Sequence, residues 1–419
     1  MAFVDLHIHS KYSRATSKDL TIENLAKYAK IKGLDCLGTG DFLHPQWIKE
    51  VKEKLKFQNG IYEFDNVKFI PTVEISLAYT QKGDDDKAKG RRIHHLITAP
   101  DFDVVDQITE WFKKKGRIDY DGRPIFGLSS IELIEEMVSI SKDILVIPAH
   151  AYTPWFGIFG SMSGFDSLKE CFQEKTKHIY AIETGLSSDP PMNWRMSFLD
   201  NVSIVSFSDN HSFWPWRLGR ECTEISGIEN YKDIFDAIKN QKIKSTIEFF
   251  PEEGKYHYDG HRNCNFCCEP AESNKLKNIC PQCGSAMTIG VLNRIEQLAD
   301  RPVGTKSPSA KSFVSLVPLS ELIGHAFSTT TFSKKTWEIY NLFVEKFGNE
   351  FNVMLNAQKE DLAKVNEKVS ELIIKNREGK IKMTPGYDGV YGKIILDEHK
   401  GIKHLVEKKD NRGLMRYVK

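Results

Sequence analysis

The stretch Asp5-Leu6-His7-Ile8-His9-Ser10 contains the first candidate metal ligands of the chain. It closes an apolar-rich segment, residues 3–8, that predicts a short β-strand. Residues two positions apart on a strand point to the same side, so His7 and His9 can bind one metal ion. Because a single His-x-His pair is common on ordinary surface strands, the metal interpretation needs support from elsewhere in the chain.

Potential metal ligands recur at the ends of further predicted strands. Strands are expected at residues 36–39, 67–75, 93–99, 144–149, 179–183 and 203–208, and helical patterns such as 21–32 and 130–141 lie between several of them. This alternation predicts an α/β fold with a parallel sheet and crossover helices, and the number of units favours a closed barrel. The residues at the strand ends are Asp41, Glu74, His94 or its neighbour His95, His150, Asp209 and His211.

These strand-end residues have the chemistry of one metal centre. In a parallel barrel the carboxyl ends of the strands meet on one face, where active sites are built. Imidazole and carboxylate ligands together suit Zn²⁺, Mn²⁺ or Fe²⁺. A carboxylate such as Glu74 can bridge two ions about 3.5–4 Å apart, an arrangement that serves phosphoryl chemistry. The pattern therefore predicts a metal-dependent phosphoesterase.

A second metal motif lies in the middle of the chain. Cys264-x-x-Cys267 and Cys280-x-x-Cys283 have the spacing of a structural Cys₄ zinc site, in which every position is filled and none is left for substrate. Cys268 is a rival for Cys267, and His261 is an outside candidate. A segment this short and polar is expected to need the metal in order to fold.

Length and composition set the domain organisation. A chain of 419 residues suggests two or three domains, with expected boundaries at 1–250, 251–300 and 301–419. The last region reads as a proline-containing linker followed by helices such as 366–376. It ends in residues 375–419, which hold twelve Lys/Arg and six Asp/Glu. No long apolar run or signal peptide is seen, so we expect no membrane contact and a reducing, cytoplasmic setting.

The first 220 residues resemble the PHP (polymerase and histidinol phosphatase) family, through Asp5–Ser10 together with Pro148-Ala149-His150 and Ser208-Asp209-Asn210-His211. The resemblance implies a distorted (β/α)₇ barrel that hydrolyses phosphoesters with two or three metal ions. It implies as ligands His7, His9, Asp41, Glu74, His94, His150, Asp209 and His211. Two residues depart from the family pattern. Arg14 stands where Asp or His is common, and Asp41 stands where His is common. The resemblance therefore leaves the occupancy of the third metal site open.

The whole chain further resembles the endonuclease Q family of DNA-repair nucleases. The resemblance is carried by residues 38–42, 94–96 and 386–392 (Gly-Tyr-Asp-Gly-Val-Tyr-Gly) in addition to the metal motifs. It implies hydrolysis of DNA on the 5′ side of uracil, hypoxanthine, xanthine or an abasic site. Zinc is the expected active-site ion, with Mn²⁺ or Mg²⁺ as alternatives, beside one structural zinc. A sliding clamp is conceivable as a partner, although residues 413–419 lack a clamp-binding box.

Aromatic and basic residues follow the predicted ligands. Trp155 and Phe159 come after His150, and Trp214 and Trp216 come after Asp209, so they are candidates for stacking on an extruded base. Packing within a loop core is the alternative for all four.

Two arginines and two carboxylates complete the predicted site. Arg217 and Arg220 are candidates for phosphate contact. Asp209, Glu74 and Arg217 are the expected catalytic residues.

Two other functions fit part of the sequence. A small-molecule phosphatase of the PHP family would explain the metal ligands but not the cysteine motif or the basic C-terminal region. A catalytically degenerate DNA-binding protein is supported only by the departures at Arg14 and Asp41. Metal content distinguishes them, because the degenerate protein is expected to hold only the structural zinc.

Overall fold

The computed structural model describes residues 1–83 and 87–395. All the strands expected in the first half of the chain form. They are β1 (Ala2–Asp5), β2 (Cys36–Gly38), β5 (Val67–Ile70), β6 (Thr72–Lys82), β7 (Ala88–Thr98), β9 (Leu145–Pro148), β10 (Ala181–Glu183) and β11 (Ser203–Val205). The fold is therefore mixed α/β, as predicted.

The main sheet is not purely parallel, which corrects the prediction. Its order is β16-β13-β12-β1-β2-β5-β4-β3. Only the β1–β2, β2–β5 and β13–β16 pairs run parallel, whereas β12 pairs antiparallel with β1. The strands that the sequence did not suggest are β3 (Lys56–Gln58), β4 (Ile61–Phe64), β12 (Cys222–Ile225), β13 (Ser245–Glu248) and β16 (Ser312–Ser315).

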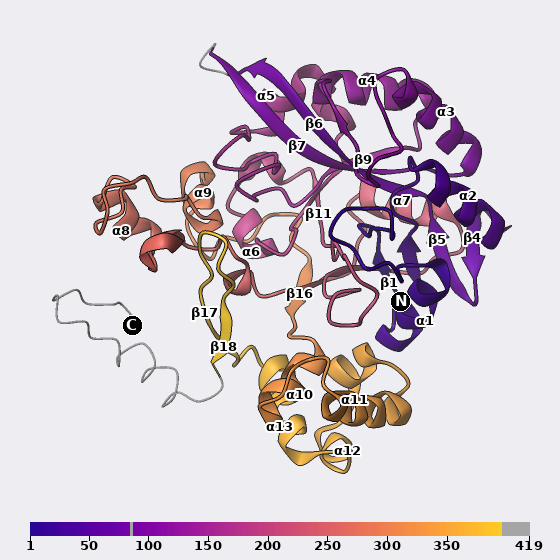
Figure 1. The fold of residues 1–419 in the computed structure, drawn as a ribbon, viewed down its shortest axis with the longest axis vertical. Coiled ribbons are helices and arrows are strands. Elements are labelled where there is room, and N and C mark those ends of the chain that lie inside the picture. Colours follow the sequence, from indigo (N-terminus) through magenta and orange to yellow (C-terminus); the bar gives the residue numbers. More distant parts are fainter. Residues whose placement is uncertain (84–86, 396–419) are drawn as a thin grey trace.

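A second sheet has the order β8-β6-β7-β9, where β8 is Ile125–Phe126. Strands β6 and β7 form the long hairpin that projects at the top of Figure 1. The hairpin includes a charged stretch, because residues from Ala88 to Arg92 pair with β6. The parallel pair β10–β11 brings the ends of those two strands side by side.

Helices begin and end where local chemistry directs them. In α1 (Ile22–Lys32) the Thr21 side chain accepts a hydrogen bond from the Asn24 backbone N–H, and Gly33 ends the helix with φ 101°. The predicted helix after residue 130 is α4 (Ser130–Ile140), capped by Ser129. The other longer helices of this half are α2 (Pro45–Lys54), α3 (Phe102–Lys113) and α7 (Tyr231–Lys239).

The cysteine-containing segment forms a small module beside the sheets. It contains the hairpin β14 (Asp259–His261) and β15 (Phe266–Cys268) and the helices α8 (Pro270–Lys275) and α9 (Val291–Leu298). The turn at residues 386–392 returns to this module, because the Tyr258 and Tyr387 backbones form a bridge. In Figure 1 the hairpin β17 (Lys382–Thr384) and β18 (Lys393–Ile395) accordingly reaches back toward α9.

The C-terminal region is mostly helical, as expected, and packs below the main sheet (Figure 1). It comprises α10 (Leu319–Phe327), α11 (Lys334–Phe347), α12 (Lys359–Ala363) and α13 (Glu367–Arg377). One apolar core includes Leu25 and Ala29 of α1 together with Tyr340 and Phe343 of α11, so the C-terminal helices share a core with the first half of the chain. Most of the basic segment 375–419 lies outside the described residues, including 413–419, where a clamp-binding box was sought. Within the described part, no helix is both long and apolar enough to cross a membrane.

Candidate metal centre

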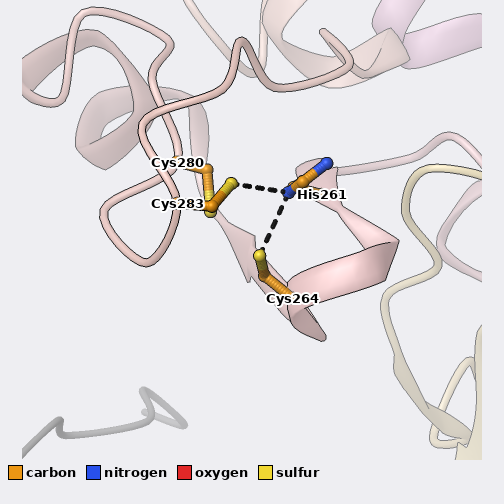
Figure 2. A group of neighbouring side chains, drawn as sticks. All are labelled: His261, Cys264, Cys280 and Cys283. Carbon is orange, nitrogen blue, oxygen red and sulfur yellow. Dashed lines mark hydrogen bonds between the residues drawn. The ribbon is translucent and has the colours of Figure 1, made fainter.

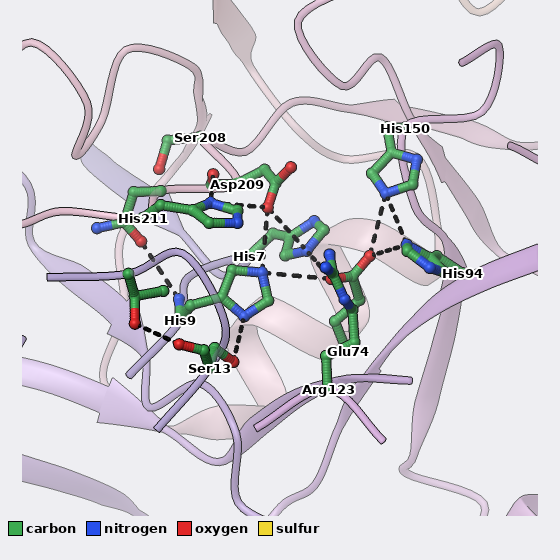
Figure 3. A network of polar contacts seen from close by, with 12 residues as sticks. His7, His9, Ser13, Glu74, His94, Arg123, His150, Ser208, Asp209 and His211 are labelled. Carbon is green, nitrogen blue, oxygen red and sulfur yellow. Dashed lines mark hydrogen bonds and ion pairs between the residues drawn. The ribbon is translucent and has the colours of Figure 1, made fainter. Parts of the chain in front are cut away.

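Glu74 lies at the centre of the strand-end residues. Its side chain is fully buried and separates two groups of potential ligands (Figure 3). In each group the ligand atoms lie within 4.8 Å of one another. The first group is His7, His9, Glu74 and Asp209, and the second is Glu74, His94 and His150.

The first group is built from the ends of β1 and β11 around one oxygen of Glu74. Glu74 Oε2 lies 3.5 Å from His7 Nε2 and 3.3 Å from His9 Nε2. Asp209 Oδ1 closes the group at 3.1 Å from His9 Nε2. Burial raises the pKa of Asp209, but the nearby His7 and His9 outweigh it and hold that pKa well below its usual value. Asp209 is therefore ionised, as a metal ligand must be.

Two buried carboxylates set the tautomers of these histidines. His7 Nδ1 donates to Glu183, with 2.9 Å to each carboxylate oxygen, and His9 Nδ1 donates to Asp41 Oδ1 at 3.1 Å. Both Nε2 atoms are thereby left with a free lone pair that points into the group. Among residues 1–83 and 87–395, no hydrogen-bond partner is found for the buried His7 Nε2. A divalent cation satisfies this atom and fits the donor set.

The second group surrounds the other oxygen of Glu74. His94 Nδ1 lies 2.6 Å from Glu74 Oε1, and His150 Nε2 lies 3.0 Å from it. The two ring nitrogens are 3.2 Å apart. Burial lowers the pKa of His94 to about 4, which favours the neutral form that binds metal. Its neighbour His95 points the other way, with Nε2 2.9 Å from Ser130 Oγ.

Three residues of the site have a strained backbone. The backbone φ angles of Asp41, His150 and Asp209 are 50°, 32° and 44°, in the left-handed region that residues other than glycine rarely adopt. Such strain costs on the order of 1–3 kcal/mol and persists where the surroundings enforce it, often at functional sites.

Two predicted ligands lie outside both groups. Asp41 is fully occupied as an acceptor, because Oδ2 accepts from Ser10 N–H at 2.6 Å and from Ser13 Oγ at 2.9 Å. It therefore orients His9. His211 lies edge-on to His9, with ring centroids 4.8 Å apart, and its Nδ1 donates to the Asp209 carbonyl at 3.0 Å.

Among the described residues, neither predicted arginine forms an ion pair with Glu74, whereas Arg220 interacts electrostatically with Asp209. The charge of Arg217 acts on the buried acids Glu253 and Glu321. Arg220 lies over the Phe249 ring and donates to the Ser208 carbonyl at 3.4 Å.

Sequence reasoning missed two side chains at the centre, Arg123 and Glu183. Arg123 Nη1 lies 2.9 Å from Glu74 Oε2 (Figure 3). Arg123 stands in a turn with no recognisable pattern. Glu183 is the last residue of the buried strand β10, a position that could have signalled it as a site residue, whereas Glu74 lies near the start of β6.

Of the two aromatic candidates for base stacking that follow His150, one lies at the surface and the other in the core. Trp155 is 36% exposed and lies edge-on to Tyr256 at 5.4 Å. Phe159 is fully buried against Tyr152, so it belongs to the loop core and does not face a substrate.

Trp214 and Trp216 stack on each other at 5.1 Å, and both contact Trp337 of α11. These two residues thus join the first half of the chain to the C-terminal helices.

The cysteine module brings together one histidine and three cysteines. The group consists of His261, Cys264, Cys280 and Cys283 (Figure 2). His261 Nδ1 lies 3.3 Å from the sulfur atoms of Cys264 and Cys283. Hydrogen bonds from Ser285 lower the pKa of Cys283 to about 6, which favours the thiolate. In this group His261 stands where the sequence suggested Cys267, which lies on β15 outside the group. A Cys₃His set suits the tetrahedral coordination that Zn²⁺ prefers in structural sites.

Sequence comparisons identify relatives along the chain. A family model described as the MJ0043 C-terminal domain matches residues 318–380. The uncharacterized protein YqxK of Bacillus subtilis is 30% identical over 417 residues, which cover 94% of this chain and 98% of that protein. The uncharacterized protein MJ0043 of Methanocaldococcus jannaschii is 34% identical over 292 residues. That match covers 68% of this chain and only 35% of the longer protein.

Two solved structures resemble nearly the whole chain. One is the crystal structure of the lesion-specific endonuclease PfuEndoQ from Pyrococcus furiosus, with a TM-score of 0.84 and 34% identity. The match covers 95% of this chain and 96% of that chain. The other is endonuclease Q in complex with a 27-mer duplex substrate that has an abasic lesion at the active site. It has the same TM-score and identity, over 95% and 97% of the two chains.

Proposed function

Because the chain belongs to the endonuclease Q family, we propose that it is a metal-dependent endonuclease that recognises lesions in DNA. The observation that carries this activity is the position of Glu74, whose two oxygens face two separate groups of histidines. A carboxylate so placed suits two divalent ions about 3.5–4 Å apart, as in enzymes that hydrolyse phosphodiesters. The strand ends that supply these ligands belong, on this proposal, to a distorted barrel of the PHP type.

The proposed substrates are duplexes with an abasic site, uracil, hypoxanthine or xanthine, cut on the 5′ side of the lesion. The abasic site has direct support from the endonuclease Q complex. Flipping a nucleotide costs least where the base is mispaired or missing, which favours damaged positions. The exposed Trp155, on the loop after His150, is suitably placed to contact the unpaired nucleotide.

The residues of the site have distinct tasks in the proposed hydrolysis. One ion would be held by His7, His9, Glu74 and Asp209, and another by Glu74, His94 and His150. Such ions would supply hydroxide near neutral pH and offset charge on the phosphate. Glu183 and Asp41 hold the histidines in the tautomer that leaves Nε2 free. The attacking oxygen adds to phosphorus in line with the leaving sugar oxygen, which departs with a proton from water.

The remaining regions serve structure and DNA binding on this proposal. One structural zinc would be held by His261, Cys264, Cys280 and Cys283. The turn at residues 386–392 helps to dock this zinc module, because Thr288 donates a hydrogen bond to Asp388. Region 301–419 supplies backbone contacts to DNA through its basic residues, since phosphate contacts dominate affinity.

Incubation with end-labelled duplexes tests the activity. Duplexes carrying a single uracil, hypoxanthine or abasic site are compared with an undamaged duplex, with and without chelator, and the nick is mapped. We expect chelator-sensitive cleavage on the 5′ side of the lesion. Equal cleavage of the undamaged duplex, or no cleavage with any metal, would contradict the proposal.

Two controls separate this activity from the alternatives. The Asp209→Asn variant is expected to bind the abasic duplex at near wild-type affinity and to cut it at least about 10²-fold more slowly. Turnover of histidinol phosphate in preference to nicking would instead favour a small-molecule phosphatase.

A further inference from the structure

The loop between α3 and β8 brings one guanidinium group to the metal centre. Arg123 Nη1 forms an ion pair with Glu74 Oε2 at 2.9 Å. Glu74 itself is fully buried, whereas the Arg123 side chain is 27% exposed. Arg123 therefore lies beside Glu74 at the partly exposed edge of the centre, and one of its nitrogen atoms contacts that carboxylate (Figure 3).

The backbone of this loop is held firmly against the site. A Cβ atom on Gly122 would lie 2.3 Å from Asp41 Oδ2 and from Ser13 Oγ, so only glycine allows this approach. The Gly122 N–H donates to the Tyr12 carbonyl at 3.1 Å. Because Asp41 in turn orients His9, the loop and the first ligand group are parts of one rigid unit.

Arg14 and Asp121 complete the support of the loop. Asp121 Oδ1 accepts from the backbone N–H of Arg123 and of Arg14, each at 3.2 Å. The Arg14 side chain also pairs with Asp121 Oδ2 at 3.2 Å. The residue that departs from the PHP pattern thus holds the loop that presents Arg123.

Glu74 also contacts His7, His9, His94 and His150. In a centre that holds divalent ions, those ions would neutralise Glu74, so its charge does not by itself require this arginine. A guanidinium has five N–H donors in a planar fork, and one contact with Glu74 leaves the others for a phosphate at this edge of the centre. Fixed donors aimed at developing charge are among the largest contributions to catalysis.

We propose that Arg123 is a catalytic residue that binds a non-bridging oxygen of the scissile phosphate and offsets its charge in the transition state. This inference rests on the proposed nuclease function and adds the phosphate-binding residue to it. Arg217 interacts with Glu253 and Glu321, and Arg220 lies over Phe249 and interacts with the charge of Asp209. Among the described residues, Arg123 is the arginine that pairs with Glu74.

Single-turnover nicking of the abasic duplex tests the role. We expect Arg123→Ala to slow nicking by roughly 10²–10³-fold, with Arg123→Lys in between, because an ammonium cannot make the bidentate contact. Added guanidinium should restore part of the rate of Arg123→Ala. The matched control is Arg117→Ala in the same loop, whose 75% exposed side chain pairs only with Asp119 among the ion pairs of residues 1–83 and 87–395.

Metal content and thermal stability distinguish catalysis from support. Both should match the wild type in Arg123→Ala. The inference is wrong if Arg123→Ala nicks at the wild-type rate. It is also wrong if the loss of metal accounts for the whole loss of rate and added guanidinium does not restore nicking.

The test also separates this inference from the proposed function. If the wild type cuts no damaged duplex but hydrolyses bis(4-nitrophenyl) phosphate, the proposed function fails, and the same variants on that ester decide the role of Arg123. If the wild type hydrolyses neither substrate, both conclusions fall.

Discussion

Glu183 shows how much of the site depends on one side chain behind the ligands. Both of its oxygens lie 2.9 Å from His7 Nδ1, and Oε2 also accepts from the His150 N–H at 2.7 Å. One carboxylate therefore positions a ligand from each of the two groups. Partners of this kind typically contribute about 10–100-fold to metal affinity.

The Glu183→Gln variant should consequently bind active-site metal about 10–100-fold more weakly, because the amide is a poorer acceptor for His7. Metal retained after dialysis against buffered zinc measures this. Glu174→Gln is the control, since that glutamate is 67% exposed and pairs only with Lys175 among the described residues. Equal retention in both variants would show that Glu183 has no such role.

Glu248 makes stability depend on pH. Burial raises its pKa to about 8, against 4.5 for an ordinary glutamate, although Ser206 Oγ donates to it at 2.5 Å. The folded state therefore favours the protonated acid. Its contribution to stability is complete below about pH 4.5 and is lost as the pH rises through about 8.

The Glu248→Gln variant should remove this dependence. Its melting temperature relative to the wild type should rise by a few degrees, roughly, between pH 6 and pH 9. Calorimetry at both pH values measures the difference, and Glu53→Gln on the surface of α2 should show none. A constant difference across this range would mean that Glu248 is ionised in the folded protein.

At the scale of elements, the sequence predicted the strands that lead to the candidate ligands but not how these strands pair. The strands expected near His7, His94, His150 and Asp209 all form because each is a short apolar run. Antiparallel pairing of β7 with β9 depends on contacts between distant segments, which local patterns do not encode. Arg123 could not be predicted for the same reason, since its loop meets Glu74 only in the folded chain.

The cysteine module shows the same limit in its ligands. Spacing suggested Cys267, but strand β15 turns that residue away while β14 brings His261 to the other three. The Cys-x-x-Cys spacing predicts only a local turn. The remaining ligand, His261, comes from the neighbouring strand of the hairpin, and its position depends on tertiary structure.

Matched substitutions test this ligand set. His261→Ala should lose the structural zinc after a chelator challenge and lower the melting temperature, because folding of such a module depends on its metal. Cys267→Ala should keep the zinc. Zinc content by mass spectrometry measures both, and the opposite result would restore the Cys₄ assignment.

At the scale of the whole molecule, a buried ion pair joins the first half of the chain to the C-terminal helices. Lys32, the last residue of α1, donates to Glu350 Oε1 at 2.8 Å and to the Pro215 carbonyl at 2.8 Å. Glu350 also accepts from Tyr340 of α11 at 2.7 Å. Pro215 lies between the two tryptophans that contact Trp337, so polar and aromatic contacts meet at one junction.

Breaking this pair should destabilise the whole molecule. The Lys32→Met variant leaves Glu350 as a buried, uncompensated charge, which should cost about 3–5 kcal/mol of unfolding free energy. The double variant Lys32→Met/Glu350→Met should recover most of this loss, because two apolar side chains replace both charges. The surface variant Lys30→Met, which breaks a largely exposed pair with Asp65, should cost about 0–1 kcal/mol.

Chemical denaturation of the four proteins measures these values. A single cooperative transition in each would mean that the C-terminal helices unfold together with the strands that carry the metal ligands. If Lys32→Met costs no more than Lys30→Met, or if the double variant is as unstable as the single one, the pair does not hold the two parts together. The shared apolar core and the contacts of Trp214 and Trp216 with Trp337 would then be what joins residues 318–380 to the first half of the chain.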